Sequence, residues 1–415
     1  MAILKIKDSA GVVTEIASIK GTSGKSPIIQ DGYWWNYNDT TKEYENTNIS
    51  LGNIVTVSDV EPDTDLWVDT SVTDITPIEI TIRTDGVPEL ETNDADTRWL
   101  VGRRCLVKKT ENGVSISYLN GDNSTLFSDG TTAASLDGTM GQWMVDLPAF
   151  YYKVEGDKIL ISSIMLDNYR YSERVLVGVT KGIITDSKLW SKSGFAPSTD
   201  NIVNFHNAAN NLGDGFDIIE YETRKKLLLM YYAKFATRNV VEGFGTANAV
   251  SGSTATLGNN NGTTSTQTNI FGIEDLYGNI GELTAGLISL DTRAFIFNGY
   301  WIDREPIGDY RSLYFPFEVT TSGFISKVSW NTYGDFLPLA FSGSSSTYYC
   351  DYAEVVKTGW SVAIMGGGSS ANAGLTYLSL VNPSTFADAG SRLQYKGKIT
   401  VIDDPATFKA LAVGF

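Results

Sequence analysis

The apolar and polar positions along most of the chain follow the pattern of β-strands. Residues 1–20 alternate apolar and polar side chains, and further short runs follow between residues 140 and 190. Alternation with a period of two residues is typical of strands that bury one face. The segments 33–37 and 42–49 flank a polar turn and predict a hairpin, and Asn112-Gly113 between CLVKKT and VSISYL predicts another.

One long helix is predicted over residues 217–239. Apolar positions from Ile219 to Phe235 approximate one helical face, and Asp217 is placed to cap the N-terminus. We expect this helix to pack against a sheet and assign it no chemistry. The i,i+4 ion pairs expected on its surface are Glu220 with Arg224 and Glu222 with Lys226.

The fold class expected from these patterns is α+β and β-rich, with small N-terminal β modules followed by a larger domain that carries the helix. The expected parts are residues 1–52, an N-terminal module with an aromatic hairpin, residues 53–138, a β-rich intermediate region, and residues 139–415. Residues 1–52 also resemble small modules near the N-termini of phage tail proteins, and this resemblance implies an attachment role. The aromatic cluster in 33–44 is interpreted as a small core, with a carbohydrate platform as the alternative. The Gly/Ser/Thr/Asn-rich segment 243–269 is either mobile or held against a neighbouring subunit.

Composition and charge exclude several classes of partner. The net charge is −16, so the chain has no basic surplus for phosphate backbones or anionic lipid. It has no run of 18 apolar residues and no N-terminal apolar segment, which predicts neither a membrane span nor a signal peptide. Cys105 and Cys350 are the only cysteines and are interpreted as buried free thiols, with a disulfide between them as the alternative.

The residues offer little for catalysis. His206 is the only histidine, which excludes a multi-histidine metal site, and we interpret it as a structural residue. The glycines at 366–368 are not followed by the lysine of a phosphate-binding loop. The turn at 214–217 is acidic but lacks the spacing of a calcium loop, so no metal and no cofactor is predicted. Paired carboxylates for glycoside cleavage remain open, because the chain has 48 Asp and Glu residues.

Residues 359–395 carry the strongest functional signal. A glycine-rich turn at 366–368 is followed by small polar residues and then by an alternating strand from Leu375. Tyrosine, serine and asparagine around such a turn match the composition of antibody paratopes. The predicted ligand-binding residues are Tyr348, Tyr349, Asp351, Tyr352, Ser361, Ser369, Ser370, Asn372, Tyr377, Ser379 and Asn382.

Three separated motifs carry a resemblance to a known family. GGGSS…NAGL with YLSLVNPS and GSRLQY resembles the variable segment of C-type-lectin-like proteins diversified by retroelements, among them phage tail proteins similar to the major tropism determinant. FGIEDLYGNIGEL (271–283) resembles the D-L-x-G-N-V-W-E signature of the formylglycine-generating-enzyme-like branch of that fold. GQWMVDLPAFYYKVE (141–155) is similar to a segment of phage tail-fibre proteins. The resemblance covers roughly residues 140–400.

The resemblance implies that residues 139–415 form a C-type-lectin-like ligand-binding domain of a phage tail-tip receptor-binding protein. It implies no enzymatic activity, a host cell-surface protein or glycan as ligand, other tail proteins as partners, a homotrimer, and a place in the virion. Positions altered by diversification would surround a scaffold of Gly367, Gly368, Gly374, Leu375 and Arg392. Gly281-Glu282 departs from the family's Trp-Glu, and the paired cysteines of formylglycine chemistry are missing. Two alternatives stay open: a tail-associated glycan-degrading enzyme with paired carboxylates, and a bacterial ligand-binding lectin.

Overall fold

The structure is a computed structural model, and it describes two compact units of the chain. One unit comprises Met1–Pro77 with Ser162–Tyr169, and the other comprises Ile78–Ile161 with Arg170–Phe415. In the strands that precede residue 75, and at residues 313–314 and 321, the structure describes the backbone but not the side chains. The residues outside the description are 1–2, 8–12, 19–27, 31–32, 39–42, 51–54, 59–65, 70–75, 245–267, 291–292, 298–309, 315–320, 356–358, 368–371 and 383–388.

The first unit contains short strands in two sheets. β4 (Tyr33–Asn38) and β5 (Glu43–Ser50) are antiparallel neighbours, which confirms the first predicted hairpin. The interpretation of its aromatic side chains lies outside the described residues. β3 (Ile28–Gln30) completes that sheet, and the other has the order β2 (Val13–Ser18), β1 (Ile3–Lys7), β7 (Leu66–Asp69), β6 (Val55–Ser58).

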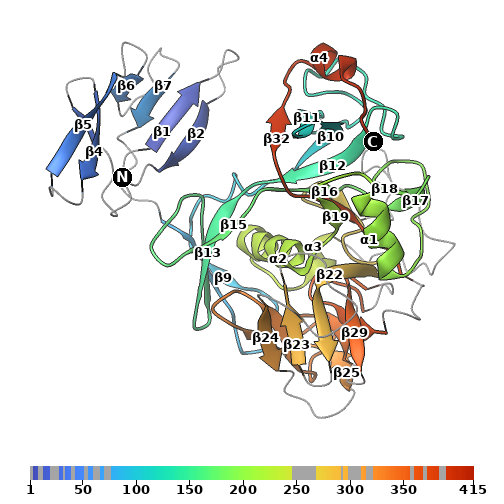
Figure 1. Cartoon of the computed structure of the whole chain (residues 1–415). Coiled ribbons are helices and arrows are strands. Elements are labelled where there is room, and N and C mark those ends of the chain that lie inside the picture. The colour runs from blue at the N-terminus through green and yellow to red at the C-terminus, as the bar shows by residue number, and fades with distance from the viewer. Residues whose placement is uncertain are drawn as a thin grey trace. The chain divides into compact units, whose positions relative to one another are not determined.

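The second unit is a β-rich α+β structure built on two large sheets (Figure 1). The β12 sheet has the order β19 (Phe216–Ile218), β31 (Leu393–Tyr395), β16 (Val175–Gly178), β12 (Gln142–Leu147), β10 (Arg103–Thr110), β11 (Gly113–Tyr118), β32 (Ile399–Val401). The β22 sheet has the order β24 (Arg311–Tyr314), β23 (Arg293–Ile296), β22 (Glu282–Leu290), β29 (Trp360–Met365), β30 (Leu378–Val381), β28 (Tyr352–Val355), β25 (Thr321–Phe324).

Smaller pairings complete the unit among the described residues. The β13 sheet has the order β15 (Arg170–Ser172), β13 (Phe150–Glu155), β14 (Lys158–Ser162), β8 (Ile78–Thr81), β9 (Glu91–Thr92). The two-stranded pairs are β17 (Ile183–Thr185) with β18 (Lys188–Trp190), β20 (Asn269–Ile270) with β21 (Ile273–Glu274), and β26 (Lys327–Trp330) with β27 (Phe336–Ala340).

The hairpin predicted at Asn112-Gly113 joins β10 to β11, and its turn is shifted by one residue. Thr110 pairs with Gly113, so Glu111 and Asn112 form the turn. Gly113 has φ +122°, and a Cβ at this position would meet the carbonyl of Lys398 on the segment before β32. The glycine therefore serves the close approach of β32, which runs parallel to β11.

The predicted domain boundaries at residues 52 and 138 do not coincide with the division between the two units. β10 pairs with β12, and β8 pairs with β14. Residues 78–138 therefore share sheets with residues that follow position 139. The expected intermediate region 53–138 is divided, because residues 53–77 belong to the first unit and residues 78–138 to the second.

The long predicted helix is present as α2, Tyr221–Phe235, and it begins four residues later than predicted. Asp217 does not cap it, because residues 216–218 pair with β31 as strand β19. Ala236 ends the helix in the left-handed conformation. The sequence patterns missed three shorter helices among the described residues: α1 (Ile202–Asn210), α3 (Val240–Phe244) and α4 (Pro405–Ala410).

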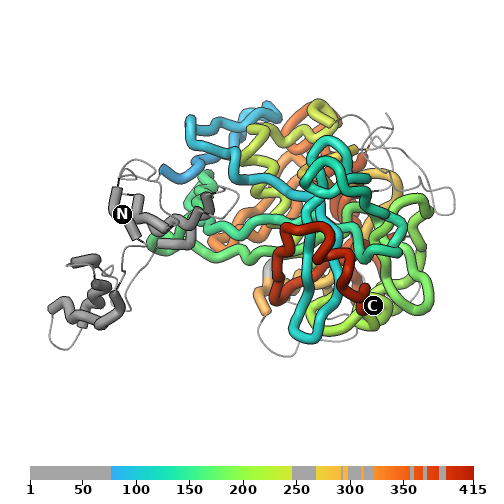
Figure 2. Tube along the Cα trace, turned by 90° about the horizontal axis from the view of Figure 1, so that it is seen from above, coloured from blue at the N-terminus to red at the C-terminus, as the bar shows by residue number. Residues whose placement is uncertain are grey.

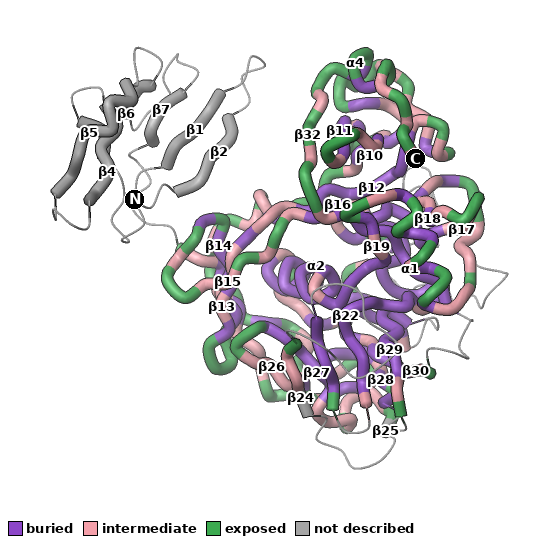
Figure 3. Tube along the Cα trace, in the orientation of Figure 1, coloured by how far each residue is buried: buried purple, intermediate pink, exposed green. Residues whose placement is uncertain are grey.

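α2 is buried on nearly all sides between the β12 and β22 sheets (Figures 1 and 3). Several of its charged side chains consequently pair with other elements, and the two predicted i,i+4 ion pairs are wrong. Within the helix, Glu222 pairs with Lys225. Arg224 pairs with Glu282 of β22, and Glu220 accepts from Lys396 at 2.6 Å. A helix enclosed by sheets has no solvated face on which such pairs form.

The C-terminal residues close the β12 sheet at one edge. Figure 2 shows the last segment beside the β10–β11 hairpin. The buried Lys108 ammonium donates to the carbonyl oxygens of Phe408, Lys409 and Leu411, at 3.0, 3.2 and 2.6 Å. These bonds satisfy carbonyl groups at the end of α4 and fix the C-terminal segment on the sheet.

Candidate functional site

The glycine-rich turn after β29 is held on the loop that precedes β22. Gly366 and Gly367 have φ of +80° and +69°, a region that favours glycine. The backbone N–H of Gly278 donates to the carbonyl oxygens of both glycines, each at 3.1 Å. A Cβ on Gly366 would meet the carbonyl of Leu276. The start of the predicted variable segment therefore has one fixed path.

A buried cluster of charges lies beneath this turn. Glu282 Oε1 accepts from Lys181 at 2.8 Å and from Arg392 at 3.0 and 2.6 Å, and its Oε2 pairs with Arg224. All four side chains are almost completely excluded from solvent. Burial alone would raise the pKa of Glu282, but the three cations outweigh it and hold this pKa below its usual range.

Arg392 connects this cluster to two segments of the backbone. Its guanidinium also donates to four carbonyl oxygens at 2.8–3.1 Å, those of Gly178, Val179, Glu274 and Asp275. Full burial fits the scaffold role expected for Arg392, Gly374 and Leu375, and Gly368 lies outside the described residues. Glu282, which follows the altered motif position Gly281, is thus the centre of the framework.

A second buried contact holds the segment before β30. Asp351 Oδ2 accepts from the backbone N–H of Thr376 at 2.7 Å and from its hydroxyl at 2.6 Å. Burial raises the pKa of Asp351 to about 7, and the bonds from Thr376 offset part of that rise. Oδ1 lies against Gly374, where a Cβ would overlap the carboxylate, and has no hydrogen-bond partner among the described residues. Gly374 is therefore required for space.

Four predicted ligand-binding side chains are buried and are not exposed to a ligand. Tyr349 and Asp351 are 2% and 1% exposed, and Ser361 and Ser379 are 4% and 8% exposed. Alternation alone does not identify the solvent side here, because both faces of the β22 sheet are covered over much of its area.

Tyr348 and Tyr349 pack toward the end of α2 and the loop near Gly86. The Tyr349 ring lies 4.8 Å from the Arg238 guanidinium, and burial raises the pKa of its phenol. The Tyr348 ring covers Gly86, and the backbone N–H of Tyr348 donates to the Gly86 carbonyl at 2.8 Å. Neither tyrosine belongs with the residues around β30.

Three of the predicted side chains come together at one end of the β22 sheet. β28 and β30 are parallel with Glu354 opposite Ser379, so Tyr352, Glu354 and Ser379 face the same side. Tyr377 directly precedes β30 and lies beside them, with its pKa raised by burial and then by the Glu354 carboxylate. We call these four residues the Tyr352 face. Tyr352 and Tyr377 are half-buried, and Glu354 is exposed.

One further predicted residue, Asn372, lies beside the Tyr352 face, because its carbonyl accepts from the Tyr352 N–H at 3.2 Å. Asn382 follows β30 with an exposed side chain and is not brought into this group. Ser369 and Ser370 lie outside the described residues, in the segment between Gly367 and Asn372. The structure thus brings together a smaller set than predicted: Tyr352, Asn372, Tyr377 and Ser379.

The residues considered for catalysis occupy structural positions. His206 Nδ1 lies 2.8 Å from Asp217 Oδ1, and its Nε2 lies 2.7 Å from Asn210. Cys105 and Cys350 are both free and buried, which confirms their interpretation. In the described ranges no cluster of three or more His, Cys, Asp or Glu side chains is arranged to hold a metal ion.

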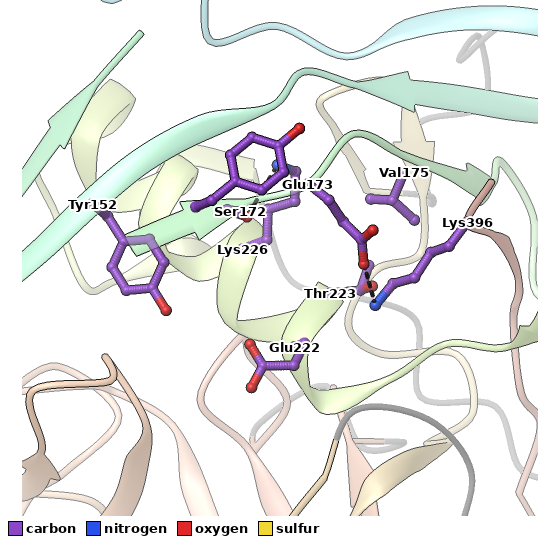
Figure 4. Close-up of a pocket in the computed structure, with 9 residues that line it drawn as sticks. Tyr152, Ser172, Glu173, Val175, Glu222, Thr223, Lys226 and Lys396 are labelled. Carbon is purple, nitrogen blue, oxygen red and sulfur yellow. Dashed lines mark hydrogen bonds and ion pairs between the residues drawn. The ribbon is translucent and has the colours of Figure 1, made fainter. Parts of the chain in front are cut away.

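Sequence reasoning missed a polar cavity beside α2. It has a volume of about 280 Å³ and is lined by Tyr152, Tyr171, Ser172, Glu173, Val175, Glu222, Thr223, Lys226 and Lys396 (Figure 4). The available signal was a pair of lysines, Lys225 and Lys226, directly before three leucines in the helix. Lysines directly beside such an apolar run indicate that their ammonium groups are buried in the interior.

Comparison of the sequence with protein-family models and with curated proteins gives no match to either. Among the helices that the structure describes, none has the length and apolar character needed to cross a membrane.

Proposed function

We propose that this chain is a non-enzymatic receptor-binding protein whose second unit includes a C-type-lectin-like ligand-binding domain. The proposed contact surface consists of Tyr352, Glu354, Asn372 and Tyr377, with the buried Ser379 on the same side of the sheet behind them. The observation that carries the proposal is the placement of Tyr352 and Tyr377 side by side, next to polar residues at the end of a fixed turn.

The chemistry of this surface suits recognition. Tyrosine offers a large contact area with few torsions to restrict, and asparagine and serine supply adaptable hydrogen bonds. The Tyr352 ring is supported edge-on by Phe324 of β25, with ring centroids 5.5 Å apart. An aromatic side chain held in this way loses little conformational entropy when a ligand binds.

The buried contacts beneath this surface hold its backbone, so its side chains can be substituted without unfolding the protein. The Glu282 cluster, the Gly366-Gly367 turn and the Asp351–Thr376 contact fix the backbone from below. None of these contacts uses the side chains of Tyr352 or Asn372. Substitutions at those two positions therefore act on binding more than on stability.

The resemblance to retroelement-diversified tail proteins supplies the setting of the proposal. The protein would stand at the tip of a phage tail as a homotrimer, with its N-terminal unit attached to other tail proteins. Three weak sites on one trimer gain avidity on a cell surface. A reverse transcriptase gene and a near-copy of the 340–395 coding segment beside the gene are expected, together with tail genes. Their replacement by cellular genes would favour a bacterial lectin.

The proposal is tested by binding the fluorescently labelled protein to a panel of bacterial strains. We expect saturable binding to a subset of strains, with no new reducing ends released from their capsular or outer-membrane glycans. Release of reducing ends would instead identify a glycan-degrading enzyme.

One observation favours that second function. Glu173 and Glu222 line the same cavity, as a pair of catalytic carboxylates would. Each is already engaged in ion pairs, Glu173 with Lys396 and Glu222 with Lys225 and Arg311. Because these ion pairs occupy both carboxylates, neither glutamate is free to act on a glycosidic bond. Binding without cleavage is therefore the preferred function.

A further inference from the structure

The cavity beside α2 shares no residue with the Tyr352 face and has a chemistry of its own. Lys226 and Thr223 reach it from the helix, and Ser172 and Glu173 reach it from the end of β15 (Figure 4). Tyr171 of β15 is 59% exposed, whereas Lys226 is 2% exposed. The cavity therefore has an open aromatic side and an ammonium group at its enclosed side.

Lys226 is held without a direct counter-ion. Its Nζ donates to the Ser172 hydroxyl at 3.2 Å and lies 4.2 Å from the centre of the Phe150 ring. In the described part of the chain no carboxylate is within ion-pair distance of this Nζ. Burial lowers the pKa of Lys226 to about 7. An amine in such a place binds a hydrogen-bond acceptor readily, because the acceptor replaces lost water.

The surrounding charges decide the class of ligand. Lys396 pairs with Glu173 at 3.0 Å and with Glu220 at 2.6 Å. With Lys226 protonated, two ammonium groups face these two carboxylates. Glu222 belongs to a separate group, in which Lys225 and Arg311 balance Glu222 and Asp335. The charges around the cavity already cancel, so an anionic ligand would bring an excess negative charge.

A neutral ligand with several hydroxyl groups fits this arrangement. Carboxylates accept hydrogen bonds, lysine donates them, and a sugar hydroxyl does both. The exposed Tyr171 ring, supported by Tyr151 at 5.3 Å, offers an apolar surface for the C–H face of a pyranose. A volume of about 280 Å³ is small for a ligand pocket and suits one sugar ring.

We propose that this cavity is a binding site for a single neutral sugar unit, with Tyr171 against the ring and Lys226, Glu173 and Ser172 bonded to its hydroxyls. The site is separate from the Tyr352 face and does not depend on that surface. It takes a terminal sugar of a larger glycan or a free monosaccharide, since both present the same ring.

Binding of this kind is coupled to protonation of Lys226. The ammonium form donates hydrogen bonds to the sugar, so binding favours the charged state and affinity falls as the pH rises above 7. Other titratable groups near Lys226 are Glu173 and Lys396 beside the cavity, Asp146 on β12, Glu222 on α2, and the phenols of Tyr152 and Tyr171. If only the charged form binds, affinity drops about 30-fold between pH 6 and pH 8.5.

The test uses the full chain and the methyl glycosides of glucose, galactose, mannose and N-acetylglucosamine. These probes are neutral and cannot open to aldehydes, which excludes condensation with the lysine amine. Ligand-detected NMR and titration calorimetry are run at pH 6 and pH 8.5 on wild type, Lys226→Met and Tyr171→Ala. Lys158→Met, at an exposed ion pair, is the matched lysine control.

We expect millimolar binding of at least one glycoside at pH 6, a loss of 10-fold or more in both test variants, and no change in Lys158→Met. Tyr171 is exposed, so Tyr171→Ala remains informative if Lys226→Met misfolds. The proposal is overturned if no glycoside binds at pH 6 or if Tyr171→Ala binds like wild type. A Tyr352→Ala variant should bind the glycosides normally, which separates this site from the proposed receptor surface.

Discussion

Thr376 holds Asp351 by two hydrogen bonds to the same carboxylate oxygen, one from its backbone N–H and one from its hydroxyl. Asp351 directly precedes β28, and Thr376 directly precedes Tyr377. The contact thus joins the two strands that carry the Tyr352 face through a buried group, and the stability of this junction depends on pH.

Asp351→Asn is expected to change how stability varies with pH. The folded-state pKa of about 7 lies above the usual 3.8. Between these values the native state binds more protons than the unfolded state, so stability from this group falls as pH rises through that window. The slope reaches about 1.4 kcal/mol per pH unit and is absent in the variant. Urea unfolding at pH 5, 6, 7 and 8 measures it, and equal slopes in both proteins would contradict burial of the charge.

Glu282→Gln is expected to destabilise the protein strongly. The substitution leaves Lys181, Arg224 and Arg392 buried around a neutral amide, and an uncompensated buried charge costs about 3–5 kcal/mol. Glu155→Gln is the control, because the exposed Lys153–Glu155 pair contributes less than about 1 kcal/mol. Denaturant unfolding of both variants compares them, and a similar small effect would show that the cluster does not support the framework.

Lys226→Met is expected to stabilise the protein most at low pH. Because the folded pKa of Lys226 is lowered to about 7, the native state binds fewer protons than the unfolded state from pH 7 to 10. Its contribution to stability therefore rises with pH over that range and is least favourable below pH 7. Removing the amine should add on the order of 2–4 kcal/mol at pH 6 and less at pH 9. Thermal unfolding at both values tests the sign, and a gain that is larger at pH 9 would refute it.

Gly374→Ala is expected to distort the segment before β30. The added methyl group would overlap the Asp351 carboxylate, and overpacking of this kind costs about 1–3 kcal/mol. Gly121→Ala is a suitable control, because nothing lies within 4 Å of a Cβ placed there. The melting temperature should fall for the first variant only. Equal melting temperatures would mean that the segment can move aside at no cost.

Local patterns predicted the parts of this fold that depend on neighbouring residues. The hairpin at Asn112-Gly113 and the helix in 217–239 were both identified, because turn residues and apolar spacing can be recognised within a short stretch of sequence. The start of the helix was misplaced because residues 216–218 pair with β31, about 175 positions away in the chain. No short stretch of sequence around Asp217 contains strand β31.

Burial near the candidate surface was the least predictable property. Tyr349 and Tyr352 stand in the same polar-aromatic stretch, yet one packs under Arg238 and the other lies on the Tyr352 face. Positive φ at Tyr348 and at Cys350 turns the backbone on either side of Tyr349, and the local sequence does not indicate this turn. The Glu282 cluster was missed for a similar reason, since its cations lie 58 to 110 residues away.

The central claim is that a fixed backbone presents replaceable side chains to a cell-surface ligand. Its most direct test compares wild type with the double variant Tyr352→Ala, Asn372→Ala for binding to strains that the wild-type protein recognises. We expect at least a 10-fold loss of cell binding, with a melting temperature within about 3 °C of wild type. Unchanged cell binding in a folded double variant would contradict the account.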